Sequence, residues 1–285
     1  FDVKPPAGDV KRTTVSSLAA KGGKITLSQD LLQDLIASRS KVNVTVGPAA
    51  LLDVAGVLAA LDKYPYGCAE QTVSRALPLV YANAVATQLG LGVDKVIRER
   101  VQGAIDRVLE MQDSSGAFGV WGPYATDMWL TAYVTDFLTR AKEANYTVAH
   151  GAFQQALDRL ANFVSFAQDS PNGGESRAFP LYGRAPNGRA AVGAPRYRAA
   201  KAQLGAALSM VGDKERAERS FKAALVAFDA SAKDTTRADF GSRLRDGAAL
   251  VTLASESGVG KAEAPRLVNL VSRAYRAARY TSTQE

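Results

Sequence analysis

The sequence predicts a mainly α-helical protein built from helical hairpins, with a short β-rich segment at its N-terminal end. From Ala49 onward, apolar residues recur at the spacing of three and four that is typical of amphipathic helices. Loops rich in glycine or aromatic residues separate the successive helical stretches, as expected for antiparallel hairpins in series. We therefore divide the chain into a partial β segment, 1–48, and a helical domain, 49–285.

The β-rich segment contains two stretches in which β-branched residues alternate with others. These stretches are Lys24–Leu27 and Lys41–Val46, and turns containing glycine flank them. The intervening residues, 28–40, contain leucines that predict a short helix or an irregular excursion. We interpret residues 1–48 as the end of a β-domain that leads into the helical one.

Apolar periodicity predicts a series of helices in the helical domain. Pro78 should kink the second of them or mark its true start, because proline lacks an N–H group. Asp127 is expected to cap the fourth. Residues 280–285 have the pattern of a cap without a following helix, so we expect the domain to be truncated at its C-terminal end. The predicted helices span residues 51–63, 72–89, 93–111, 127–138, 152–166, 195–211, 214–229, 240–256 and 262–278.

The composition limits the chemistry that the chain can perform. Its 285 residues include one cysteine and one histidine. A single cysteine excludes an internal disulfide. One cysteine and one histidine are too few ligands for an ordinary zinc site. We therefore expect no metal and no cofactor. No apolar run approaches the length of a transmembrane span, so this stretch of chain is not expected to insert into a membrane.

The positive charge of the chain does not indicate a nucleic-acid partner. The formal net charge is +7 and the isoelectric point is about 9.5. The basic residues are dispersed among acidic ones along the predicted helices, which is typical of solvated helix faces. We expect no nucleic-acid binding, although a cationic surface favours an acidic partner or an anionic envelope.

Residues 64–71, Tyr-Pro-Tyr-Gly-Cys-Ala-Glu-Gln, contain the lone cysteine and a glutamine three residues beyond it. The Cys68 thiolate can displace ammonia from the Gln71 carboxamide, which leaves an intrachain thioester in a small ring. Pro65 and Gly67 supply a turn that exposes the start of the next helix. The alternative interpretation is that Cys68 is a small buried apolar residue, which is the commonest role of a free cysteine.

The order Gly-Cys-x-Glu-Gln after Tyr-Pro-Tyr resembles the thioester motif of the α2-macroglobulin and complement C3 family. Ala69 replaces the glycine that is usual in the animal proteins, so the motif is more similar to that of the bacterial α2-macroglobulins. Residues 112–119, Gln-Asp-x-x-Gly-x-Phe-Gly, resemble the hairpin loops shared by thioester domains, protein prenyltransferases and terpene cyclases. This resemblance implies an α/α toroid, a terpenoid cyclase-like fold, whereas periodicity alone also allows an open superhelix.

The resemblance also implies the context of the domain. In this family the thioester domain is inserted into a β-sandwich of the CUB type, which would account for residues 1–48. It implies a single-use protease inhibitor, not a turnover enzyme, that couples covalently to lysines of the attacking protease. The family resemblance further implies a periplasmic lipoprotein anchored to the inner membrane through a lipidated N-terminus. The other domains of the same chain would be partners, as would a peptidoglycan synthase of the penicillin-binding class.

A thioester hydrolyses in water unless apolar groups cover it. A Gly-Pro loop that carries Trp121 and Tyr124 is a candidate cover, because loops seldom expose tryptophan without a partner surface. The residues predicted to shield the thioester are Tyr64, Tyr66, Trp121, Tyr124, Met128 and Trp129.

The attacking nucleophile is predicted from the position of the one histidine. In complement proteins that acylate hydroxyl groups, a histidine after the Gly-x-Phe segment first takes the acyl group. The lone histidine, His150, lies instead at the start of a later helix. The resemblance therefore implies direct attack by amines, which gives an amide to Gln71 and a free Cys68 thiol. Glu70 is expected to assist as a local base or to orient the backbone of the ring.

Three alternatives belong to other classes of protein. Residues 204–224 fit one tetratricopeptide pattern, which favours a helical-repeat binding scaffold without thioester chemistry. A helical-barrel glycosidase would need paired carboxylates, and Asp127 and Asp136 lack the expected pairing. A cysteine protease would need a histidine base, for which His150 is the lone candidate. Sensitivity to methylamine separates the thioester from all three.

Overall fold

The computed structural model describes much of the helical domain and part of the N-terminal segment. The described residues are 10, 12, 14, 16, 18–19, 21–40, 42, 44, 46, 67–88, 95–166, 198–230 and 242–277, without the side chains of 84–88. The predicted helix 51–63 lies outside them. The chain divides into two compact units, Phe1–Ala55 and Gly56–Glu285. The predicted boundary after residue 48 falls within 47–66, outside the described residues, and stays a prediction.

The described part of the first unit contains two short 3₁₀ turns, η1 (Gln29–Leu32) and η2 (Ala37–Arg39). They occupy the segment for which a short helix or an irregular excursion is predicted. Residues 24–27, predicted as a strand, have no strand pairing among the described residues. A strand is stable only when a neighbouring strand completes its hydrogen bonds. The β character of this segment therefore stays a prediction.

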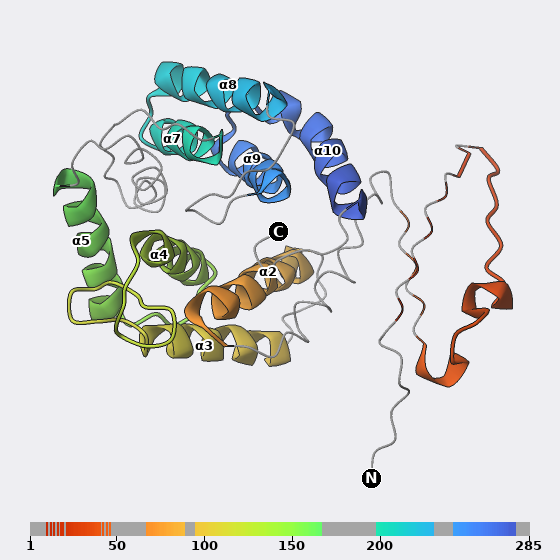
Figure 1. The fold of residues 1–285 in the computed structure, drawn as a ribbon, viewed down its shortest axis with the longest axis horizontal. Coiled ribbons are helices and arrows are strands. Elements are labelled where there is room, and N and C mark those ends of the chain that lie inside the picture. The colour runs from red at the N-terminus through yellow and green to blue at the C-terminus, as the bar shows by residue number, and fades with distance from the viewer. Residues whose placement is uncertain are drawn as a thin grey trace, which may run out of the picture. The chain divides into compact units, whose positions relative to one another are not determined.

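The described part of the second unit is helical, as the periodicity predicts (Figure 1). Each described helix lies within a few residues of its predicted position. The helices are α2 (Ala69–Gln88), α3 (Lys95–Leu109), α4 (Met128–Glu143), α5 (His150–Phe166), α7 (Arg198–Met210), α8 (Lys214–Ala230), α9 (Arg243–Ser257) and α10 (Ala264–Ala277), with a 3₁₀ turn η4 (Lys261–Glu263) before α10.

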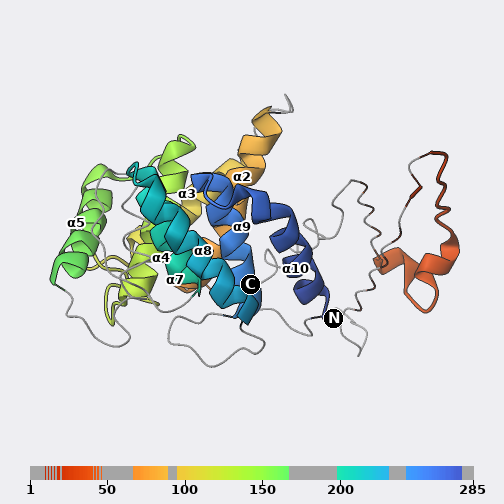
Figure 2. The ribbon, with the colours of Figure 1, turned by 90° about the horizontal axis from the view of Figure 1, so that it is seen from above.

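Helices that follow one another along the chain alternate between an inner and an outer position. In Figure 1, α2, α4, α7 and α9 lie toward the middle of this unit and α3, α5, α8 and α10 lie outside them. Consecutive pairs pack as hairpins, and α7 and α8 lie side by side in Figures 1 and 2. This alternation of inner and outer helices is the arrangement of an α/α toroid, which the loop motif predicts.

Capping residues explain where several helices begin and end. The Asp127 carboxylate accepts the Leu130 backbone N–H at 2.8 Å, which confirms it as the N-cap of α4. Ser242 caps α9 in the same way, and Gly258 ends that helix in the left-handed region at φ 74°. Pro78 lies inside α2. The expectation that it marks the true start of the helix is therefore wrong.

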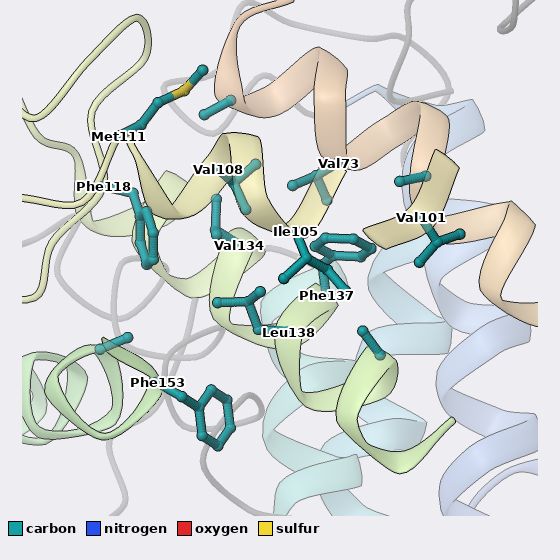
Figure 3. Packing of buried hydrophobic residues seen from close by; sticks show 14 of the residues in the cluster. Val73, Val101, Ile105, Val108, Met111, Phe118, Val134, Phe137, Leu138 and Phe153 are labelled. Carbon is teal, nitrogen blue, oxygen red and sulfur yellow. The ribbon is translucent and has the colours of Figure 1, made fainter. Parts of the chain in front are cut away.

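Two apolar clusters form the core of the described part of the second unit. The first joins α2, α3, α4 and α5, and Figure 3 shows Val73, Ile105 and Phe137 from three of these helices directed toward one another. The second joins α7, α8, α9 and α10 and includes Ala132 of α4 and Leu160 and Val164 of α5. Helices α4 and α5 thus contribute to both clusters, and α4 is buried on most of its surface.

The tetratricopeptide-like residues belong to one tight hairpin between α7 and α8. A Cβ atom at Gly205 would lie 3.0 Å from the Ala217 carbonyl oxygen and 3.2 Å from the Phe221 nitrogen. Only glycine allows the two backbones to approach this closely. The small residues of this pattern are thus explained by the packing of a single helix pair.

Candidate functional site

The candidate site begins at the first turn of α2. Cys68 immediately precedes the first helical residue and therefore occupies the N-cap position, and Gln71 occupies the third helical position. The Gln71 backbone N–H donates to the Cys68 Sγ at 3.5 Å, and the Cys68 backbone N–H donates to the Gln71 Oε1 at 3.4 Å. This reciprocal pattern is a capping box with a thiol in place of the usual hydroxyl.

The capping box brings the two groups of the predicted reaction together. It places the Cys68 sulfur and the Gln71 side-chain carbonyl on the same side of one helical turn. Cys68 is buried, with 5% of its surface exposed, whereas Glu70 and Gln71 are half-buried. The first turn of α2 thus has both a structural role, as a helix cap, and the geometry for a reaction between the two side chains.

The environment of Cys68 disfavours a free thiolate. Burial raises the pKa of the Cys68 thiol above its usual value. The hydrogen bond from the Gln71 backbone N–H opposes this increase, and the negative charge of Glu70 adds to it. A sulfur in this position is therefore more stable when it is protonated or covalently bound than as an exposed anion.

The loop between α3 and α4 packs against the start of α2. The Ala69 backbone N–H, which has no partner within the helix, donates to the Val120 carbonyl oxygen at 2.8 Å. Gly116 has φ 89° and lies against the backbone of Gln155 in α5, where a side chain would clash. The Phe118 ring is fully buried. The Gly-x-Phe-Gly motif therefore anchors this loop and holds it beside Cys68.

The predicted shielding residues are distributed over two environments. Tyr64 and Tyr66 lie outside the described residues. Trp121 and Tyr124, in the loop, are 57% and 64% exposed. Met128 and Trp129, in the first turn of α4, are half-buried. Their shielding role stays a prediction.

A third element of the site is a pair of hydroxyl groups that the sequence analysis did not identify. The Ser74 hydroxyl donates to the Glu70 Oε1 at 2.6 Å and lies 2.9 Å from the Tyr133 hydroxyl of α4. The Tyr133 ring stacks on Trp129 with a centroid distance of 5.2 Å. The four-residue spacing of Glu70 and Ser74 on an apolar helix is the signal that could have revealed the first bond.

The lone histidine, His150, is the first residue of α5, as predicted. In the part of the chain that the structure describes, His, Cys, Asp and Glu side chains form no group of three that could hold a metal ion. The described helices include none that is long and apolar enough to cross a membrane.

Comparisons with known proteins find similarity over most of the chain. The family model described as the A-macroglobulin TED domain matches residues 40–177. The alpha-2-macroglobulin of Escherichia coli K12 is 34% identical over 260 residues, which cover 82% of this chain and 16% of that protein. The chain therefore spans about a sixth of the length of this relative.

Two solved structures are similar to the computed one. Salmonella alpha-2-macroglobulin reacted with methylamine has a TM-score of 0.71 and 31% identity, covering 82% of this chain and 17% of that one. Trypsin-activated alpha-2-macroglobulin from E. coli has a TM-score of 0.65 and 32% identity, covering 78% and 17%. These similarities confirm the mainly α toroid fold.

Proposed function

This chain belongs to the α2-macroglobulin family, and we propose that it forms a thioester between Cys68 and Gln71 that couples covalently to lysine amines of an attacking protease. The chain would act as the thioester domain of a broad-spectrum protease inhibitor. Each molecule would react once, because the acyl bond to sulfur is consumed. The chain would therefore be a covalent trap and not an enzyme.

The observation that carries this proposal is the capping box formed by Cys68 and Gln71. In forming the thioester, the thiol attacks the carboxamide carbon, a C–S bond forms, the C–N bond breaks, and ammonia leaves with the thiol proton. The cap holds the two side chains against each other before the reaction, which lowers its entropic cost. Burial of Cys68 then slows hydrolysis of the product.

The similar proteins support an amine as the attacking group. The Salmonella structure is of a protein reacted with methylamine, which is a primary amine like the lysine side chain. The E. coli structure is of a protein activated by trypsin. His150, at the start of α5, is 82 positions after Cys68 in the chain and is not part of the loop beside Cys68. We therefore propose direct attack by the amine.

The proposal also covers the location of the protein and its partners. We propose a periplasmic location, with anchoring to the inner membrane through a lipidated N-terminus. The other domains of the full-length protein would be partners, and a peptidoglycan synthase of the penicillin-binding class would be a further one.

The proposal is tested by mixing the intact protein that contains this chain with trypsin and separating the products on a denaturing, reducing gel. We expect a covalent conjugate with natural trypsin and none with Cys68→Ala. Trypsin whose lysines have been dimethylated is the matched control and should form little conjugate. A conjugate that forms equally with Cys68→Ala would refute the proposal.

A further inference from the structure

The Glu70 carboxylate is bonded by a chain of two hydroxyl groups that has no assigned role in the acyl transfer. Ser74 lies one turn after Glu70 on α2, is 5% exposed, and approaches Glu70 to 2.6 Å. Tyr133 of α4 approaches the same Ser74 oxygen at 2.9 Å. A buried polar network whose members are satisfied is rigid and fixes their positions. Ser74 therefore holds the Glu70 carboxylate, and Tyr133 holds Ser74.

The direction of the two hydrogen bonds follows from the number of hydrogens available. An ionised carboxylate can only accept, so the Ser74 hydroxyl donates its one hydrogen to Glu70. The contact between Ser74 and Tyr133 must then use the hydrogen of the tyrosine. The series therefore runs in one direction, from Tyr133 to Ser74 to Glu70, and we refer to these three residues as the hydroxyl relay.

Tyr133 is fixed as the donor at the start of the hydroxyl relay. Its ring stacks on Trp129 with an interplanar angle of 20°, and it packs against both apolar clusters. Burial raises the pKa of Tyr133 well above its usual value, so the hydroxyl keeps its proton. The charge of Arg245 of α9 opposes this increase, and the charges of Glu70 and Asp136 add to it.

We propose that Ser74 and Tyr133 are positioning residues that hold Glu70 as the proton acceptor when an amine attacks the thioester. This inference rests on the proposed function. A neutral hydroxyl donor orients a carboxylate without cancelling its charge. Glu70 lies between Cys68 and Gln71 in the chain, in the first turn of α2, so its carboxylate is on the same helical turn as the bond that breaks.

The step balances without another reactant. The amine nitrogen attacks the Gln71 acyl carbon, and the Glu70 carboxylate accepts a proton from that nitrogen. The C–S bond breaks, its electron pair stays on Cys68, and Glu70 returns the proton to the sulfur. The products are an amide at Gln71, a neutral Cys68 thiol and a Glu70 carboxylate. Returning the proton matters because burial disfavours the thiolate as a leaving group.

The inference is tested with the intact protein that contains this chain, by following thiol release with methylamine after intact mass has confirmed the thioester in each variant. Glu70→Gln should slow the reaction about 100-fold, as expected for the loss of a general base. Ser74→Ala should slow it about 10-fold, the equivalent of one hydrogen bond to a charged group. Tyr133→Phe should slow it by up to about 10-fold, because it frees the Ser74 hydroxyl to turn away from Glu70. Ser74→Thr keeps the hydroxyl and should react at nearly the natural rate.

The double variant Ser74→Ala with Glu70→Gln separates positioning from general structural damage. Because Ser74 acts through Glu70, the double variant should react no more slowly than Glu70→Gln alone. Tyr146→Phe is the matched control, since it removes a tyrosine hydroxyl bonded to Asn83 elsewhere on α2, and it should leave the rate unchanged.

Two results would overturn the inference. Natural-like rates in Ser74→Ala and Tyr133→Phe would show that the hydroxyl groups do not assist the reaction. If adding Ser74→Ala slows Glu70→Gln by the same factor as it slows the natural protein, Ser74 acts independently of Glu70. A natural protein with no thioester in its mass would instead overturn the proposed function, and the inference with it.

Discussion

Helix α2 meets α4 through two polar clusters that each contain a tyrosine but are held together differently. Near its N-terminal end lies the hydroxyl relay, Glu70, Ser74 and Tyr133. Two turns after Ser74, Tyr81 joins a second group, which we call the arginine cluster and which consists of Tyr81, Asp136, Arg140 and Glu256.

One guanidinium organises the arginine cluster. The Arg140 Nε donates to both Asp136 oxygens at 3.1 and 3.0 Å, and the Nη2 donates to the Glu256 Oε2 at 2.9 Å. The Nη1 donates to Glu256 and to the Tyr81 hydroxyl. Arg140 therefore ties its own helix, α4, to α2 and to α9.

The difference between the clusters suggests different roles. In the arginine cluster, a cation pairs with carboxylates from two helices and bonds a tyrosine of a third, which favours cohesion of the three helices. In the hydroxyl relay, a carboxylate accepts a hydrogen bond from a neutral hydroxyl, which orients it. The same pair of helices thus has one end suited to chemistry and another suited to stability.

The largest expected effect comes from a substitution at Cys68 that removes the thioester chemistry and leaves stability nearly unchanged. Cys68→Ser should abolish both the loss of ammonia and the reaction with methylamine, because an oxygen in this position does not form the thioester. Stability should change little, since serine is a favoured N-cap residue, whereas Cys68→Ala should cost about 1 kcal/mol. Intact mass and thermal melting measure the two effects. A large loss of stability in Cys68→Ser would contradict the capping box.

The second largest expected effect is a loss of stability when the arginine cluster is disrupted. Arg140→Met should lower the free energy of unfolding by about 3–5 kcal/mol, because it leaves Asp136 and Glu256 without their cation in a largely buried site. Denaturant unfolding measures the change. The control is Arg219→Ala, which breaks an exposed pair with Glu215 and should cost no more than about 0.5 kcal/mol. Equal losses in the two variants would refute the cohesive role of the cluster.

The pH dependence of stability tests the contribution of Tyr81, which belongs to the arginine cluster. Burial raises the pKa of Tyr81 from 10.0 to about 12 in the folded chain. Because the folded pKa exceeds the unfolded one, this contribution to stability is complete below pH 10.0 and is lost as the pH rises toward about 12. Tyr81→Phe should reduce the alkaline loss of stability measured by thermal melting.

Tyr133 should contribute to the same alkaline loss, because burial also raises its pKa. A variant with both Tyr81→Phe and Tyr133→Phe should therefore have a flatter stability profile than either single variant. An alkaline profile that neither substitution changes would contradict the raised pKa of both hydroxyl groups.

The smallest expected effect on stability lies in the loop beside Cys68. Trp121→Ala should change the free energy of unfolding by no more than about 0.5 kcal/mol, since the side chain is 57% exposed. If Trp121 shields the thioester, the same variant should lose its thioester to water faster than the natural protein. Mass measured over time tests this. An unchanged rate of hydrolysis would remove Trp121 from the predicted shield.

Local patterns predict most of the fold because the signals that start and stop helices are local. Asp127 and the glycines around α9 mark helix ends within the sequence itself. Helix α2 begins three residues before its predicted start at Thr72, because the side chains of Cys68 and Gln71 cap it. Pro78 is accommodated inside α2, because packing of this helix against α3 and α4 outweighs the loss of one hydrogen bond.

The sequence predicts the reactive pair but not the residues that support it. Cys68 and Gln71 are three positions apart, so their proximity follows from one helical turn. Ser74 and Tyr133 are 59 positions apart, and their contact depends on how α2 packs against α4. The arginine cluster also depends on tertiary packing, because Arg140 and Glu256 are separated by 116 positions. A periodicity argument does not specify such contacts.

The central claim is the thioester between Cys68 and Gln71, and intact mass with thiol titration tests it most directly. Before treatment, the intact protein that contains this chain should be lighter than its sequence by one ammonia and should show no free Cys68 thiol. Methylamine should then add one molecule of amine as one thiol appears. A protein with its full sequence mass, a free thiol from the outset and no response to methylamine would contradict the account.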